Sequence, residues 1–131
     1  MFVNVAPDRF RIPLKLMPPF KLDIEKLPQS TEALTIYKAS GKLSIETVNE
    51  FLPKLRAETA QRVVLELSGV SFLDSAGVGA LVSLFVSRRN QGKEFGLAAL
   101  PPQASAVVTV AGLQNLLPIY KTVEDASAKN G

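Results

Sequence analysis

From residue 21 onward, short apolar segments typical of β-strands alternate with segments whose apolar residues recur every three or four positions, as on one face of a helix. The strand-like segments are residues 21–27, 33–39, 63–67, 95–100 and 117–120. Pro28, Gln29 and Ser30 form a turn cluster between the first two segments, which predicts an antiparallel hairpin. A turn at Ser68 and Gly69 is expected to end the third segment.

The first two helices are predicted from apolar spacing. Ser44 can serve as the N-cap of the first, and Pro53 should kink or shorten it. Its expected apolar face consists of Ile45, Val48, Leu52 and Leu55. The second helix has the clearest pattern, at i, i+3, i+4, i+7 and i+8, and its predicted buried face consists of Val78, Leu81, Val82, Phe85 and Val86.

Charged and capping residues mark the later helix ends. Arg88 and Arg89 fall in the last turn of the second helix and are interpreted as part of a solvated helix end. A third helix is expected from Pro101 to about residue 111, before Gly112. Thr122 can cap a fourth helix near the C-terminus.

The resulting element order, ββαβαβαβα, predicts an α/β fold with a mixed central sheet of about five strands and about four helices. Mainly parallel pairing is expected, with antiparallel pairing at one side from the opening hairpin. Residues 1–20 hold four of the nine prolines and are expected to form an extended, basic N-terminal arm. The domain then spans residues 21–126, and residues 127–131 form a C-terminal tail.

The amino-acid composition limits the catalytic and metal-binding chemistry that the chain can carry out. The 131 residues include no cysteine and no histidine, which excludes cysteine nucleophiles, disulfides, Cys/His zinc sites and triads with an imidazole base. We therefore expect no enzymatic activity, no metal and no cofactor.

Charge and hydropathy limit the classes of binding partner and the cellular location that we expect for this protein. The net charge is +3, and the arm supplies +2 of it, so the body is nearly neutral and offers no basic stripe for nucleic acid. The sequence contains neither an apolar run as long as a membrane span nor a recognisable signal peptide. A cytoplasmic protein without a membrane partner is expected.

Residues 68–79, SGVSFLDSAGVG, join a buried strand to the second helix and are the most informative segment. Asp74 is a good N-cap, and Ser75 then lies at a helix N-terminus, with an accessible hydroxyl. Gly77 and Gly79 leave little side-chain cover there, so another backbone could approach closely. Val82 stands where a dinucleotide fingerprint needs a small residue, so this pattern does not match a nucleotide site. A serine presented for phosphorylation is the competing interpretation.

The run VVLELSGVSFLDSAGVGALVSL resembles the signature of the STAS domain family, in particular of stand-alone anti-sigma factor antagonists. The resemblance extends more loosely over residues 21–126. Residues 40–43 (SGKL) resemble the glycine turn after the family's second strand, and residues 111–113 (AGL) resemble its later Ser-Gly-Leu. The arm lies outside the resemblance.

The resemblance implies a partner-switching protein. Such an antagonist binds a serine kinase that is also an anti-sigma factor, and the kinase ends the interaction by phosphorylating the antagonist. Ser75 matches the family's phosphoacceptor, and a metal-dependent serine phosphatase is the family's usual resetting enzyme. The resemblance also implies a partner-binding set consisting of Ser44, Asp74, Ala76, Gly77 and Val78.

Alternatives remain open at several of these positions. The family often has an acidic residue where this chain has Ser44, which favours as a second hypothesis an unphosphorylated STAS scaffold or adaptor in a signalling or transport assembly. A nucleotide-binding enzyme is the third. Asp74 and Ser44 can be explained as caps, Ser75 as a locally bonded residue of the first helical turn, and Gly77 by close packing. The oligomeric state is open, a homodimer included.

Overall fold

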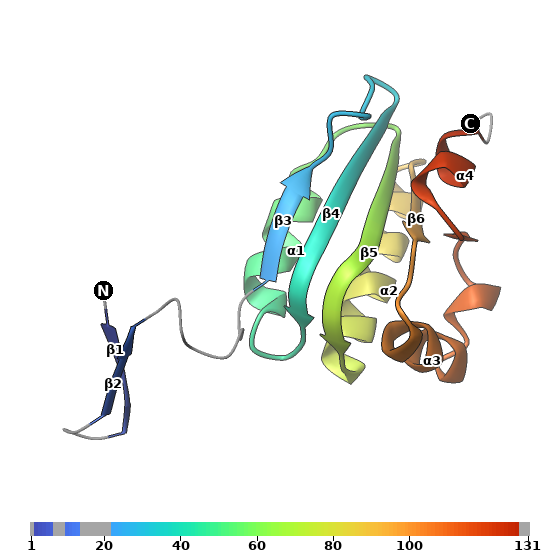
Figure 1. Ribbon diagram of the computed structural model, residues 1–131. Coiled ribbons are helices and arrows are strands. Elements are labelled where there is room, and N and C mark those ends of the chain that lie inside the picture. The colour runs from blue at the N-terminus through green and yellow to red at the C-terminus, as the bar shows by residue number, and fades with distance from the viewer. Residues whose placement is uncertain (1, 7–9, 14–21, 129–131) are drawn as a thin grey trace.

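The computed structural model describes residues 2–6, 10–13 and 22–128. A five-stranded sheet forms its centre, in the order β3-β4-β5-β6-β7 (Figure 1). β3 (Leu22–Lys26) pairs antiparallel with β4 (Leu34–Leu43), and the later strands are parallel to β4. These are β5 (Arg62–Leu73), β6 (Glu94–Ala98) and β7 (Ile119–Tyr120). The predicted mixed α/β sheet, with antiparallel pairing at one side, is confirmed.

Helices cover the two faces of this sheet unequally. α1 (Val48–Arg56), α2 (Ser75–Asn90) and α3 (Pro102–Val110) contribute their buried apolar residues to the larger core, and Figure 1 shows α1 and α2 behind the sheet. α4 (Val123–Ala128) packs on the opposite face, over a smaller apolar cluster. A 3-10 turn (Leu113–Asn115) follows α3. In the described part of the chain, no helix has both the length and the apolarity to cross a bilayer.

β5 is longer than the sequence pattern predicted. The turn expected at Ser68 and Gly69 is wrong, because both residues lie inside a 12-residue strand. The register with β4 shifts at this point, and Gly69 pairs with Ser40. A Cβ atom on Gly69 would lie 2.4 Å from Ser40 Oγ and 3.1 Å from the Ala39 carbonyl oxygen, so a side chain at this position would require Ser40 to move. The extension carries the strand into the informative segment, residues 68–79, and ends at Leu73, directly before Asp74.

α2 buries a different stripe from the predicted one. Its buried residues are Gly77, Ala80, Leu81, Leu84 and Arg88. Val78, Val82 and Phe85 are half-buried at the margin of the core, and Val86 is exposed. Small residues near the start of the helix, Gly77 and Ala80, face the sheet and let the helix pack closely against it. The buried face of α2 is therefore rotated from the face that hydrophobicity alone predicted.

Arg88 is buried rather than solvated at the helix end. It is 4% exposed, and its guanidinium donates hydrogen bonds to the backbone carbonyls of Glu94 (2.9 Å), Glu58 (3.2 Å) and Ala60. Burial lowers the pKa of Arg88 from its usual value, against the opposing effect of the Glu58 charge. One side chain therefore ties the segment between α1 and β5 to the start of β6.

Glu58 extends this connection to β4. The Tyr37 hydroxyl donates a 2.6 Å hydrogen bond to Glu58 Oε1, and burial together with this bond and the Glu58 charge raises the pKa of Tyr37 to about 12. Burial alone would raise the pKa of Glu58, but the hydrogen bonds from Tyr37 and from the Ala60 N–H and the charge of Lys26 outweigh it and lower that pKa. The cluster braces the domain at the end remote from Ser75.

The described residues at both ends of the chain form regular secondary structure. In the N-terminal arm, β1 (Phe2–Ala6) pairs antiparallel with β2 (Phe10–Pro13) as a separate two-stranded sheet. Pro13 stands at the end of β2, where the missing N–H is tolerated. At the C-terminus, α4 continues to Ala128, with Thr122 Oγ1 accepting a 3.0 Å hydrogen bond from Asp125 N as the predicted cap. The rest of the arm and tail predictions fall outside the described residues.

Candidate functional site

Ser75 is the first residue of α2 and is exposed. β5 ends two residues earlier, at the same edge of the sheet as the end of β4, because Leu43 and Leu73 are paired in register. Figure 1 shows this edge at the bottom of the view, where the arrowheads of β4 and β5 meet the start of α2. Helix N-termini carry a partial positive charge. A serine hydroxyl is thus presented at the positive end of the α2 dipole.

Asp74 uses both carboxylate oxygens to fix this end of α2. Oδ1 accepts a 2.9 Å hydrogen bond from Gly77 N, which is the predicted N-cap bond, and Oδ2 accepts a 3.1 Å hydrogen bond from Ile45 N. The second bond reaches the loop between β4 and α1. The carboxylate therefore holds two segments together beside Ser75.

Gly77 lies where α2 closely approaches the end of β4. A Cβ atom there would lie 2.4 Å from the Leu43 carbonyl oxygen and 2.6 Å from Leu73 Cδ1. No side chain fits at that distance, so the packing interpretation of Gly77 holds. By contrast, Gly79 is exposed, and a Cβ atom on it would meet nothing within 4 Å.

In the loop between β4 and α1, Ser44 is not the N-cap of the helix, so that prediction is wrong. Thr47 occupies the N-cap position of α1, and its hydroxyl accepts from Ser44 N (3.1 Å) and donates to Lys42 O (2.7 Å). Ser44 is 1% exposed and donates a 2.6 Å hydrogen bond to Glu46 Oε1. Glu46 therefore supplies a carboxylate to this loop two residues after the position where the family often has an acid.

Residues 40–43, interpreted as a glycine turn, lie within β4 instead. Gly41 has a φ of 111°, a conformation that favours glycine, and the pairing with β5 shifts directly after it. The chain reverses only after Leu43. The glycine thus shapes the end of the strand that leads into the loop.

The structure brings the six predicted site residues to one edge of the domain. By exposure they are Ser75 (exposed), Asp74, Ala76 and Val78 (half-buried), and Ser44 and Gly77 (buried). A partner can reach the first four directly. Ser44 and Gly77 contribute to this edge through hydrogen bonding and packing.

Two further residues at this edge were not predicted. Ile45, assigned to the buried face of the first helix, is 63% exposed because α1 begins only at Val48. Gln103, near the start of α3, accepts from Leu73 N (2.9 Å) and donates to Leu73 O (3.0 Å). Its side chain thus fixes the end of β5 from the α3 side. The Pro101-Pro102 start of α3 signalled a helix at this point but not this contact.

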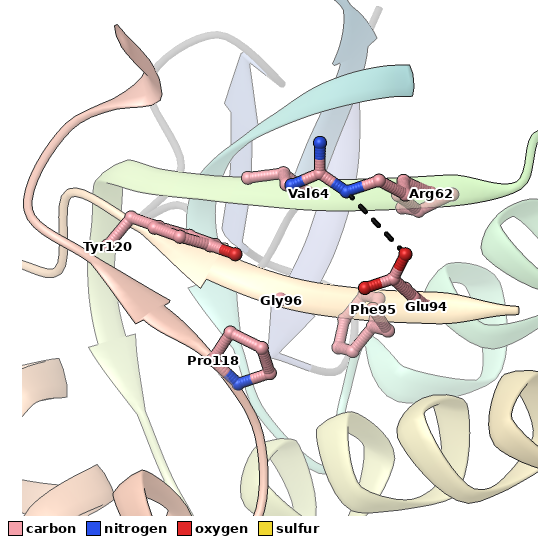
Figure 2. Close-up of a pocket in the computed structure, with 8 residues that line it drawn as sticks. Arg62, Val64, Glu94, Phe95, Gly96, Pro118 and Tyr120 are labelled. Atoms are coloured by element: carbon pink, nitrogen blue, oxygen red, sulfur yellow. Dashed lines mark ion pairs between the residues drawn. The ribbon is translucent and has the colours of Figure 1, made fainter. Parts of the chain in front are cut away.

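A hollow at the opposite end of β5 does not belong to this site. Figure 2 shows Arg62 facing Glu94, with a 4.0 Å separation between Arg62 Nε and Glu94 Oε2, and Tyr120 and Pro118 on the other side. Its cavity volume is about 10 Å³, about the space of one water molecule, whereas small-molecule sites usually have about 300–1,000 Å³. It offers no room for a nucleotide.

Asp74→Ala should lower the free energy of unfolding by about 1–2 kcal/mol, because both Gly77 N and Ile45 N lose their acceptor. Asp74→Asn should lose less, since an amide oxygen can still cap the helix. Urea denaturation followed by circular dichroism measures both. Asp23→Ala, on the exposed part of edge strand β3, is the matched control and should change little. Equal midpoints for Asp74→Ala and Asp23→Ala would contradict this role.

The fold and the Asp-Ser-Ala-Gly helix start identify the class of domain. A family model described as "STAS domain" matches residues 25–126, and the chain belongs to this family. The match covers the five-stranded sheet almost completely and begins after the N-terminal arm.

Individual relatives give more specific comparisons. The chain is similar to the anti-sigma-B factor antagonist of Staphylococcus aureus, with 24% identity over 90 residues that cover 66% of this chain and 83% of the relative. An anti-sigma factor antagonist from Mycobacterium paratuberculosis matches in structure with a TM-score of 0.69 and 24% identity, over 80% of this chain and 92% of the other. The STAS domain of a SulP transporter from Vibrio cholerae matches with a TM-score of 0.60 and 24% identity, over 76% and 80%. At such identities the structural likeness establishes the fold.

Proposed function

We propose that this chain is an anti-sigma factor antagonist, which binds an anti-sigma factor serine kinase through the N-terminus of α2 and is released when Ser75 is phosphorylated. The observation that carries the proposal is the exposure of Ser75 as the first residue of a capped helix. The names of the sequence relative and of a structural neighbour support the role. In this function the chain is a regulated partner and a kinase substrate, and not itself an enzyme.

The covalent step is a phosphoryl transfer supplied by the kinase and ATP. The Ser75 oxygen attacks the γ-phosphorus, the new Oγ–P bond forms as the bond to the β-phosphate oxygen breaks, ADP leaves, and the serine proton passes to a base of the kinase. A serine phosphatase resets the switch by hydrolysing the phosphoserine with water. Exposure of Ser75 allows both enzymes to approach.

Charge explains why phosphorylation releases the partner. A phosphoserine adds about −1.5 to −2 charges at neutral pH, at an edge that already carries the carboxylates of Asp74 and Glu46. The helix N-terminus favours an anion by about 0.3–1 kcal/mol, so α2 stays folded. The cost therefore falls on the interface, where the added anion must be desolvated against the bound kinase.

Incubation of the protein with an anti-sigma factor kinase and ATP should place one phosphate on Ser75, mapped by mass spectrometry. Ser75→Ala should lose the label completely because its side chain has no nucleophile. Ser71→Ala is the matched control, because Ser71 is also exposed, near the end of β5, and its loss should leave labelling unchanged. Unaltered labelling of Ser75→Ala would overturn the assignment.

A binding measurement with the same kinase compares the affinities of the wild-type chain and of Ser75→Asp. Ser75→Asp should weaken kinase binding about tenfold if charge is the switch, and equal affinity would contradict the electrostatic part. An unphosphorylated STAS adaptor makes the opposite prediction: a stable large assembly by size-exclusion chromatography that is insensitive to Ser75 substitutions.

A further inference from the structure

We propose that the partner kinase binds this chain beside Ser75 through Ile45. The Ile45 side chain inserts into an apolar pocket of the kinase that is sized for a branched aliphatic group. The identity of the partner rests on the function proposed above. The assignment of Ile45 itself rests on its exposure, on the rigidity of its loop and on its attachment to Asp74.

Exposure sets Ile45 apart from its neighbours. Among the described residues, five large hydrophobic side chains are exposed, namely Ile45, Phe72, Val86, Val110 and Leu116. Two of them, Ile45 and Phe72, lie at the carboxyl ends of β4 and β5, next to Ser75. Phe72 pairs with Lys42 on the sheet face opposite to Leu43, and the Lys42 ammonium lies 5.9 Å from its ring centroid. Ile45 is 63% exposed, and its N–H is bound to Asp74, the N-cap of α2. Of the two residues, Ile45 is therefore the exposed apolar group attached to the start of α2.

The loop that carries Ile45 is fixed by hydrogen bonds on both sides of the residue. The Thr47 hydroxyl bonds Ser44 N and Lys42 O, and Ser44 O accepts from Thr47 N (2.9 Å) and Val48 N (3.0 Å). The Ile45 N–H itself is bound to Asp74 Oδ2 at 3.1 Å. A loop backbone held in place before binding loses little conformational entropy in the complex, which favours Ile45 as an interface anchor.

Continuity with the α2 N-terminus indicates which partner covers Ile45. The Asp74 carboxylate bonds Ile45 N and Gly77 N with its two oxygens, so the loop and the first turn of α2 form one surface around Ser75. A kinase that places its catalytic groups at Ser75 must also face Ile45. The carboxylates of Glu46, the next residue, and Asp74, which binds the Ile45 N–H, would be repelled by an anionic bilayer, so a protein pocket is favoured over a lipid surface.

The test measures binding of the anti-sigma factor kinase by isothermal titration calorimetry. Ile45→Ala should raise the Kd about tenfold or more, whereas Ile45→Val, which keeps a branched side chain, should change it little. Val110→Ala is the matched control, since Val110 is 90% exposed on α3, and it should leave the Kd unchanged. All three substitutions are at exposed positions and should preserve the unfolding midpoint.

The outcomes separate this inference from the proposed function. Equal affinities of Ile45→Ala and Val110→Ala, with Ser75 still phosphorylated, would overturn the role of Ile45 alone. Loss of binding in Ile45→Ala without any phosphate on wild-type Ser75 would support Ile45 and overturn the switch. No binding of the kinase to the wild-type chain would overturn both. A dimer in sedimentation that Ile45→Ala abolishes, at unchanged kinase affinity, would assign Ile45 to a contact between two copies and overturn the proposal.

Discussion

Replacing Arg88 with methionine should lower the free energy of unfolding by about 3–5 kcal/mol. The guanidinium is buried and donates to the carbonyls of Glu94, Glu58 and Ala60, and each carbonyl left without this donor costs about 1–3 kcal/mol. Methionine has a similar length and offsets part of the loss by burying apolar surface. Urea denaturation measures the difference.

Arg89→Met is the matched control for this experiment. Arg89 is the next residue of α2 and is exposed, so its replacement should change the stability by no more than about 0.5 kcal/mol. Arg88→Lys should fall between the two, because one ammonium nitrogen cannot occupy the positions of the three guanidinium nitrogens that donate to the three carbonyls. If Arg88→Met and Arg89→Met unfold at the same urea concentration, Arg88 does not brace the two segments.

The contrast between these two arginines shows what the sequence could not reveal. Both occupy the last turn of α2, and their position next to the negative helix end explains either one as a solvated charge. Only the tertiary structure decides that Arg88 points at three carbonyls of distant segments. Long-range hydrogen bonds of this kind leave no periodic signal.

The order of strands and helices was predictable because apolar periodicity records which residues face a core. The errors fall where backbone contacts between strands or helices override that periodicity. Gly69 suggested a turn, yet it lies inside β5, where it pairs with Ser40 of β4. Ile45 matched a helical spacing, yet α1 begins later, and the residue is exposed.

The candidate site was predictable for a different reason. Asp74 is a good N-cap and, with Ser75, directly precedes a strongly patterned helix, so local sequence alone places both residues at a helix N-terminus. The β4–α1 loop joins the site only through pairing between distant strands and through the Asp74–Ile45 hydrogen bond. Its contribution therefore had to come from the structure.

Gly77→Ala should destabilise the domain by about 1–3 kcal/mol, although alanine is the better helix former. The added methyl group would lie 2.4 Å from the Leu43 carbonyl oxygen and 2.6 Å from Leu73 Cδ1, and the first of these is backbone that cannot turn aside. The start of α2 must then move away from β4. Because Asp74 bonds both Gly77 N and Ile45 N, the same movement should disturb the loop beside Ser75.

Gly79→Ala provides a control with the opposite expected sign. A Cβ atom there meets nothing within 4 Å, so alanine should stabilise the helix by about 0.5–1 kcal/mol through its higher helix propensity. Thermal unfolding of the two variants beside the wild type measures both effects, and amide exchange at Ile45 reports the loop. A higher melting temperature for Gly77→Ala would show that α2 can shift without cost, and close packing would then not explain the glycine two residues after Ser75.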